Sequence, residues 1–318
     1  MNPYVFFVGC PRSGTTLVQR LANAHPELAV AHETRWIVRW WERRIGVTSE
    51  GIVTREFIER LPSHGRFKAL KIKPDELVRA YRDSEPVRYA DFVSTLFDRF
   101  AARRGKHLSG DKSPAYVRSL PTLHALWPEA KFVHIIRDGR DVCLSVLDWQ
   151  QGVPRFPTWE EDPVTTTAVW WDWNVRLGRE SGQELGPDLY CELRYEALIA
   201  DPERECAQLC AFLELPFDAA MLRFHEGRMQ DDPRLDAKKG WRPVTAGVRS
   251  WREEMAPGDV GRFEAAAGRL LDELGYARAA PSLSAEQVER AARFREAFAD
   301  EVRARGRSVP TAWEGVAA

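Results

Sequence analysis

The sequence has 318 residues, of which 44% are hydrophobic and 29% charged, so it is long enough to bury one large core or two small ones. The formal net charge is −1, which excludes an overall basic field of the kind that holds nucleic acid or an anionic membrane surface. Any anion must therefore be bound by a local cluster of positive groups.

Short apolar stretches alternate with amphipathic ones along the chain. The apolar stretches have the length and the unbroken character of strands buried on both faces, and they cover Tyr4–Val8, Ala69–Ile72, Phe132–Ile136 and Leu189–Leu193. The helical patterns cover Thr15–Ala24, Tyr89–Arg104, Gly139–Gln150, Thr165–Arg179 and Pro202–Leu213. Strands that alternate with helices predict an α/β fold of three layers, in which helices flank both faces of a central parallel sheet.

Outside these segments the sequence predicts two long loops and a terminal helix. Two segments without clear periodicity, Gly152–Pro163 and Asp231–Met255, are expected to be long loops. An N-cap signal at Ser284 begins a charged helix that runs to Arg305. We therefore expect one main domain over residues 1–276 and a C-terminal helical extension over residues 277–318.

The cysteines and the N-terminus bear on the cellular location. The five cysteines are odd in number and lie in apolar segments, which predicts reduced thiols, and no partner pair completes a metal site around Cys206 and Cys210. The first expected strand begins at Tyr4 and leaves no room for a signal peptide, and no run of about 18 apolar residues is present for a membrane span. We expect a cytoplasmic protein without a membrane partner.

The segment YVFFVGCPRSGTT nearly matches a phosphate-binding loop. Gly9, Gly14 and Thr16 have the Walker A spacing, but Thr15 stands where that motif has its lysine. A glycine-bracketed turn between a strand and a helix still gathers backbone N–H groups around one point, and Arg12 supplies a positive charge from within the loop. The best candidate for a Walker B strand, FVHIIRD, has Arg137 before Asp138, so we expect an anhydride bound without metal rather than a magnesium nucleotide.

Two motifs together resemble the sulfotransferases that use 3′-phosphoadenosine 5′-phosphosulfate (PAPS). The loop GCPRSGTTL resembles that family's site for the 5′-phosphosulfate, and FVHIIRDGRDVCLS resembles its 3′-phosphate segment. The resemblance extends to YCELRYEALIADP, whose tyrosine approaches the nucleotide, and to KKGWRPVTAG, which closes over the 3′-phosphate. It implies a P-loop-like fold and these donor-binding residues: Arg12, Ser13, Gly14, Thr15, Thr16, Arg137, Ser145, Tyr195, Lys238, Lys239 and Gly240.

Other segments are most similar to the tyrosylprotein branch of the family. The match of NAHPELAVAHETRWI implies that Glu33 is the catalytic base and Arg35 a substrate-contacting arginine, and GDKSP implies that Lys112 meets the transferred group. Sulfuryl transfer needs such a base and cations, and Arg12 with Lys112 would serve as the cations. Glu33 fits this role if partial burial raises its pKa. His32 and His107 are rival bases.

The acceptor is less defined by the sequence. Trp36, Trp40 and Trp41 follow the expected base and are candidates for a pocket wall, which favours an aromatic or apolar acceptor. Without an expected anchor or secretory signal, we expect a hydroxyl or amine on a small molecule or a carrier-tethered intermediate. The oligomeric state is open and includes a homodimer. A P-loop kinase using Mg-ATP and a catalytically idle nucleotide-binding protein are the alternative functions.

Overall fold

A computed structural model of the chain describes residues 2–81, 85–149, 156, 158–226 and 250–313. Its centre is a five-stranded sheet in the order β2-β3-β1-β4-β5, with every neighbouring pair parallel. The strands are β1 (Val5–Gly9), β2 (Leu28–His32), β3 (Leu108–Lys112), β4 (Lys131–Ile136) and β5 (Tyr190–Arg194). The predicted α/β fold with a central parallel sheet is confirmed.

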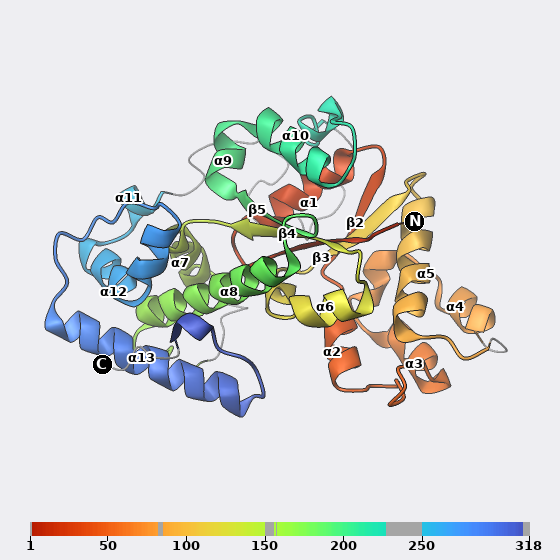
Figure 1. Ribbon diagram of the computed structural model, residues 1–318, viewed down its shortest axis with the longest axis horizontal. Coiled ribbons are helices and arrows are strands. Elements are labelled where there is room, and N and C mark those ends of the chain that lie inside the picture. The colour runs from red at the N-terminus through yellow and green to blue at the C-terminus, as the bar shows by residue number, and fades with distance from the viewer. Residues whose placement is uncertain (1, 82–84, 150–155, 157, 227–249, 314–318) are drawn as a thin grey trace.

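Helices cover both faces of this sheet (Figure 1). One face carries α1 (Thr15–Ala24), α9 (Tyr195–Ala200) and α10 (Pro202–Phe212), and the other carries α5 (Tyr89–Ala102), α6 (Leu120–Leu126) and α8 (Pro163–Leu185). The period-two alternation of β1 explains the layers, because Val5 and Phe7 enter the cluster under α1 while Phe6 and Val8 enter the one under α5.

The remaining helices lie at the two ends of the molecule. One group, on the side of β2, consists of α2 (Trp36–Glu42), α3 (Arg55–Arg60) and α4 (Pro74–Tyr81). The other group lies on the left in Figure 1 around α8 and consists of α7 (Gly139–Leu147), α11 (Trp251–Glu254), α12 (Pro257–Glu273) and α13 (Ala285–Ala304). Short 3-10 turns occupy Leu61–Ser63, Phe67–Leu70, Pro114–Arg118, Ala219–Met221 and Thr311–Trp313.

The expected terminal helix is present. Ser284 caps α13 through a capping box with Gln287, as its sequence signal predicts. Phe294 and Phe298 of this helix lie in the same apolar cluster as Trp173 of α8 and Phe263 of α12. The helix therefore shares a core with the sheet-bearing part of the chain, while the division at residues 276 and 277 stays a prediction.

Two expectations about strands are wrong. The segment Ala69–Ile72 is not a strand, because Phe67–Leu70 form a 3-10 turn and Lys71 after it is left-handed with φ 54°. The apolar residues Leu70 and Ile72 are buried in the core. Conversely, β2 and β3 were not expected. The sequence of β3, LSGDK, is too polar to read as a buried strand, yet all five of its residues are buried.

The helices agree more closely with the sequence. The five expected helices form, with ends that differ by a few residues; α8 begins earlier, at Pro163, because the Asp162 side chain caps its first turn. Cys206 and Cys210 are free and buried in the core, as expected for the inner face of a helix. The expected loop over Asp231–Met255 lies largely outside the described residues, and its described end contains α11.

Candidate active site

The candidate residues gather at the carboxyl edge of the sheet. The phosphate loop follows β1, Glu33 follows β2, Lys112 ends β3, Arg137 follows β4 and Tyr195 follows β5. Because all five strands run parallel, their carboxyl ends share one edge, where ligands bind in open α/β sheets. The fold thus brings together residues that are far apart in the sequence.

The phosphate loop is a tight turn between β1 and α1. Gly14 precedes the helix with φ 86°, and Arg12 is also left-handed at φ 79°. The Ser13 amide donates to the Cys10 carbonyl at 3.1 Å, which closes the turn, and Thr15 and Thr16 begin the helix. The first amides of a helix lack intrahelical acceptors, so this end of α1 favours an anion.

Tyr195 lies directly against this loop. A Cβ atom added at Gly14 would lie 2.3 Å from Cδ2 of the tyrosine, so the ring covers the glycine and leaves no room for another side chain. The Arg137 guanidinium lies over the same ring, 4.5 Å from its centroid. On the other side of the loop, Arg12 Nε donates to Ser145 Oγ at 3.0 Å. The loop and the segment that runs from Arg137 to Ser145 therefore meet.

Buried polar atoms at this place fit a polyanion. Within the described part of the chain, the Ser13 hydroxyl and the Arg137 Nε are buried without a hydrogen-bond partner. Arg137 forms an ion pair with Asp141 at 3.6 Å, which leaves most of its donors unused by that contact. A phosphosulfate anhydride with a second phosphate suits this set of hydroxyls, helix amides and planar guanidinium donors.

The second part of the site is an ion pair between Lys112 and Glu33. The ammonium of Lys112 donates to Glu33 Oε1 at 2.9 Å and to Thr16 Oγ1 at 3.4 Å. The lysine side chain is fully buried, and that of the glutamate is 13% exposed. Lys112 is therefore no surface partner of Asp111; it connects the phosphate loop to Glu33.

The pKa of Glu33 is shifted opposite to the expectation. Burial alone would raise it, but the charges of Lys112 and Arg35 outweigh burial and lower the pKa to about 2. Glu33 is thus ionised in this state, and the condition that partial burial raises its pKa is not met here. Arg35 also forms a direct ion pair with Glu33, and Arg66 lies 3.8 Å from the same carboxylate.

The rival bases are placed differently. Burial and Lys112 lower the pKa of His32 to about 4, so its ring is neutral at pH 7, and Nδ1 lies 3.0 Å from Gln19 Oε1. His32 Nε2 lies 4.0 Å from Glu33. His107 precedes β3 and therefore lies at the opposite edge of the sheet from Lys112.

Glu33 lies in a strained turn that the sequence did not reveal. Glu33 and Arg35 are both left-handed, with φ of 45° and 55°, a conformation that costs non-glycine residues about 1 kcal/mol or more each. The buried Asp111 carboxylate accepts from the Thr34 amide at 3.1 Å, and the Thr34 hydroxyl meets the Tyr116 hydroxyl at 3.1 Å. Asp111 thus fixes the turn, and burial raises its pKa to about 6.

The other predicted residues lie outside this centre or outside the described chain. Trp36 is fully buried and Trp40 is 6% exposed, both packed against Phe57 in the core, and Trp41 stacks with Arg44. Their role as a pocket wall stays a prediction. Lys238, Lys239 and Gly240 lie outside the described residues.

The comparison with protein families decides the class. Residues 3–219 match the model of the Sulfotransferase family. The chain belongs to this family. The resemblance to the sulfotransferase family that the sequence motifs indicated is therefore confirmed. In the part of the chain that the structure describes, no group of three or more histidine, cysteine, aspartate or glutamate side chains is arranged to hold a metal ion.

The chain is similar to protein-tyrosine sulfotransferases from animals, in agreement with the resemblance of its motifs to the tyrosylprotein branch. The chain is 24% identical to a protein-tyrosine sulfotransferase of Drosophila melanogaster over 86% of its own length and 52% of that protein. It is 26% identical to protein-tyrosine sulfotransferase 1 of Homo sapiens, over 86% of this chain and 70% of that one. The chain thus spans about half the length of the fly relative.

Two solved structures share the fold. A sulfotransferase domain from the Synechococcus PCC 7002 olefin synthase has a TM-score of 0.60 at 21% identity and covers 87% of this chain and 95% of that one. A sulfotransferase domain from the curacin biosynthetic pathway has a TM-score of 0.61 at 18% identity, covering 88% and 99%.

The expected cytoplasmic location is wrong. The animal relatives are protein-tyrosine sulfotransferases, which are Golgi membrane enzymes, and this contradicts the location inferred from the N-terminus. Among the helices that the structure describes, none combines the length and the apolar character needed to cross a bilayer.

Proposed function

We propose that this sulfotransferase moves the sulfuryl group of PAPS to a hydroxyl or amine, with Glu33 as base and Lys112 and Arg12 as the cations of the transfer. The observation that carries the proposal is the buried ammonium of Lys112, 2.9 Å from Glu33 and 3.4 Å from Thr16 in the phosphate loop. It connects the proposed base directly to the proposed donor site.

The donor residues divide into three groups. Arg12 and the loop residues Ser13, Gly14, Thr15 and Thr16 would hold the 5′-phosphosulfate, through loop amides and hydroxyls. Arg137 and Ser145 would hold the 3′-phosphate, and Tyr195 would face the nucleotide. Lys238, Lys239 and Gly240 complete the proposed set, and no metal is required.

With a hydroxyl acceptor, the reaction breaks one O–H bond and exchanges one S–O bond for another. Glu33 takes the proton of the acceptor as the acceptor oxygen forms its bond to sulfur, and the bridging oxygen leaves with adenosine 3′,5′-bisphosphate. Lys112 and Arg12 stabilise the charge that builds on the departing and equatorial oxygens.

The depressed pKa of Glu33 fits this scheme through Lys112. The ammonium is shared between Glu33 and the loop, so negative charge bound on the loop competes with the carboxylate for it. This competition weakens the strongest charge contact of Glu33 and raises its pKa toward the range in which a carboxylate accepts a proton.

For the acceptor, the surroundings of Glu33 favour a group with negative charge near the reacting hydroxyl. Arg35 and Arg66 flank the carboxylate with side chains that are 55% and 40% exposed. Burial lowers the pKa of the nearby His64, and the charges of Arg39 and Arg66 lower it further. A small or carrier-tethered acceptor with a carboxylate or phosphate would meet these guanidinium groups. This differs from the apolar acceptor that the buried Trp36 and Trp40 suggested.

Donor consumption tests the proposal. The protein is incubated with PAPS and a panel of phenols, hydroxy acids and tyrosine peptides, and release of the bisphosphate and sulfation of each acceptor are measured together. The proposal is supported if the protein sulfates an acceptor and Lys112→Ala abolishes this transfer. It is supported further if acceptors that carry a carboxylate or phosphate for Arg35 and Arg66 are sulfated faster than uncharged ones. Phosphoryl transfer from Mg-ATP in place of sulfuryl transfer would contradict it.

A further inference from the structure

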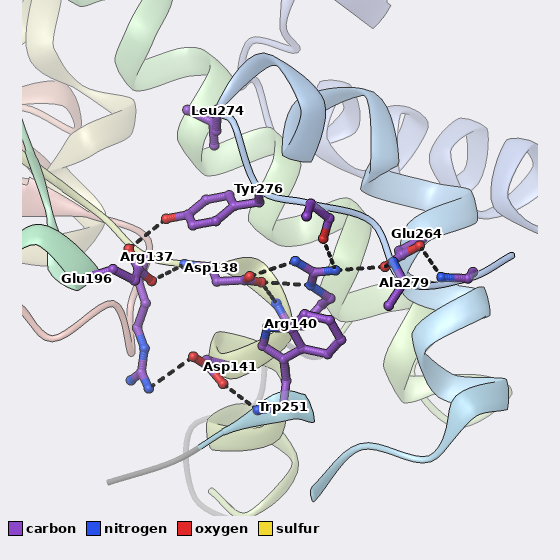
Figure 2. A network of polar contacts seen from close by, with 12 residues as sticks. Arg137, Asp138, Arg140, Asp141, Glu196, Trp251, Glu264, Leu274, Tyr276 and Ala279 are labelled. Carbon is purple, nitrogen blue, oxygen red and sulfur yellow. Dashed lines mark hydrogen bonds and ion pairs between the residues drawn. The ribbon is translucent and has the colours of Figure 1, made fainter. Parts of the chain in front are cut away.

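A single carboxylate lies behind the proposed donor site and connects three segments. Glu196 Oε1 accepts from the backbone amide of Asp138 at 2.8 Å, and Oε2 accepts from the hydroxyl of Tyr276 at 2.8 Å (Figure 2). Asp138 follows β4, Glu196 is the second residue of α9, and Tyr276 follows α12. The carboxylate thus joins the ends of two strands to a residue beyond the region that the family model matches.

Tyr276 is itself held in place. The Arg194 guanidinium lies 4.5 Å from the centroid of its ring and donates to the Leu274 carbonyl at 2.9 Å. The Tyr276 amide donates to the Leu271 carbonyl at 2.8 Å. Burial and the charge of Glu196 raise the pKa of Tyr276, so its hydroxyl stays protonated and donates to the carboxylate.

Asp138 and Glu196, which this hydrogen bond joins, are the immediate neighbours of two proposed donor residues. Arg137 precedes Asp138 and Tyr195 precedes Glu196, so the hydrogen bond between Asp138 and Glu196 sets the spacing of Arg137 and the Tyr195 ring. The guanidinium needs this support because, among its described contacts, the ion pair with Asp141 is long at 3.6 Å and Nε is unpaired.

We propose that Glu196 and Tyr276 are positioning residues that hold Arg137 over Tyr195 and thereby set the preference for a nucleotide with a 3′-phosphate. The proposal rests on the function proposed above, in which Arg137 binds that phosphate. Neither residue touches the donor; both act through the backbone of the two strand ends.

A neighbouring cluster has a different task. Arg140 forms ion pairs with Asp138 and Glu264 at 2.7 Å each, donates to the Ala277 carbonyl at 3.0 Å and stacks on Trp251 (Figure 2). These contacts join α7 to α12 within the core. Because both Arg140 and Glu264 are fully buried charges, removing either one would destabilise the fold rather than report on the donor.

The test is calorimetric titration of the full chain with adenosine 3′,5′-bisphosphate and with adenosine 5′-phosphate. We define the ratio as the dissociation constant of adenosine 5′-phosphate divided by that of the bisphosphate. This ratio reports on the 3′-phosphate alone, and a uniform loss of protein stability leaves it unchanged. Arg137→Ala should lower the ratio by about a hundredfold, Glu196→Ala by about tenfold and Tyr276→Phe by about threefold, in line with the loss of a charge-assisted contact and of its supports.

Two variants serve as controls. Glu196→Gln should stay within about twofold of the parent ratio, because its amide accepts from Asp138 and donates to the Tyr276 oxygen. Tyr190→Phe removes another tyrosine hydroxyl on β5, one that contacts His134 at 2.6 Å and Glu192 at 3.3 Å away from the loop, and it should leave the ratio unchanged.

The outcomes separate the two proposals. If Arg137→Ala lowers the ratio while Glu196→Ala and Tyr276→Phe behave like Tyr190→Phe, the positioning role is refuted and the donor assignment stands. If Arg137→Ala leaves the ratio unchanged, the donor assignment itself fails and the positioning role fails with it. If Glu196→Ala does not fold, the comparison of Tyr276→Phe with Tyr190→Phe decides the question.

Discussion

Replacing Glu33 by glutamine tests the ion pair at the centre of the site. The amide keeps the shape of the side chain but removes the charge that lies 2.9 Å from the buried ammonium of Lys112. A pKa of about 2, against an ordinary value of 4.5, means that the ionised carboxylate contributes about 3 kcal/mol to folding at neutral pH. Glu33→Gln should therefore lower the free energy of unfolding by about that amount.

The pH dependence has a definite sign. Because the folded state depresses the pKa of Glu33, its contribution is complete above pH 4.5 and is lost as the pH falls toward about 2. The difference in unfolding free energy between the parent and Glu33→Gln should thus be constant near neutrality and shrink in acid. Urea denaturation followed by tryptophan fluorescence, from pH 7 down to pH 3, measures this difference.

Matched variants make the test specific to the pair. Glu59→Gln removes a carboxylate 2.8 Å from Arg55 in an exposed helical pair and should cost about 0.5 kcal/mol or less. The double variant Glu33→Gln with Lys112→Met should be about 2 kcal/mol more stable than the two single losses predict together, because no buried charge is left alone. Equal stability of Glu33→Gln and the parent at pH 7, or a difference that persists unchanged at pH 3, would refute the reasoning.

Three further predictions concern the site. Glu33→Gln should bind adenosine 3′,5′-bisphosphate like the parent while its kcat for sulfuryl transfer falls by at least about a hundredfold; full activity in rapid-quench assays would require another base. Asp111→Asn keeps an acceptor for the Thr34 amide. Because burial raises the pKa of Asp111 to about 6, the parent should lose stability relative to this variant as the pH rises from 4 to 6, as measured by urea denaturation. An Asp111→Asn variant that is less stable than the parent at pH 7 would contradict this. Gly14→Ala, at φ 86° and against Tyr195, should weaken bisphosphate binding at least about tenfold, whereas Gly258→Ala, with open space around it, should not; equal affinities in calorimetry would overturn the proposed contact.

The donor side of the site could be predicted because its signals are local. The loop from Gly9 to Thr16 contains the turn glycines, the start of α1 and the charge of Arg12 within eight residues. The segment from Arg137 to Ser145 likewise contains an arginine, the start of α7 and a serine within nine residues. Asp138 caps α7 by accepting from the Arg140 amide, and it pairs with the guanidinium of the same arginine, two positions away. Such features depend on residues within a few positions of one another.

The properties that the sequence could not give depend on contacts between distant segments. The pKa of Glu33 is set by Lys112, 79 residues away, and no local pattern shows that this lysine is buried. The same lysine and Asp111 make β3 polar, so the strand that positions them was missed. Glu196 and Tyr276 are ordinary surface types in the sequence, and only the fold brings them to the ends of β4 and β5.

The central claim is that the altered phosphate loop holds a phosphoadenosine donor. Calorimetric titration of the full chain, without added metal, with adenosine 3′,5′-bisphosphate, and in parallel with Mg-ATP, tests it most directly. We expect tight binding of the bisphosphate and none of comparable strength for Mg-ATP. Preference for Mg-ATP, or no binding of the bisphosphate, would contradict the assignment of the loop, of Arg137 and of the chemistry built on them.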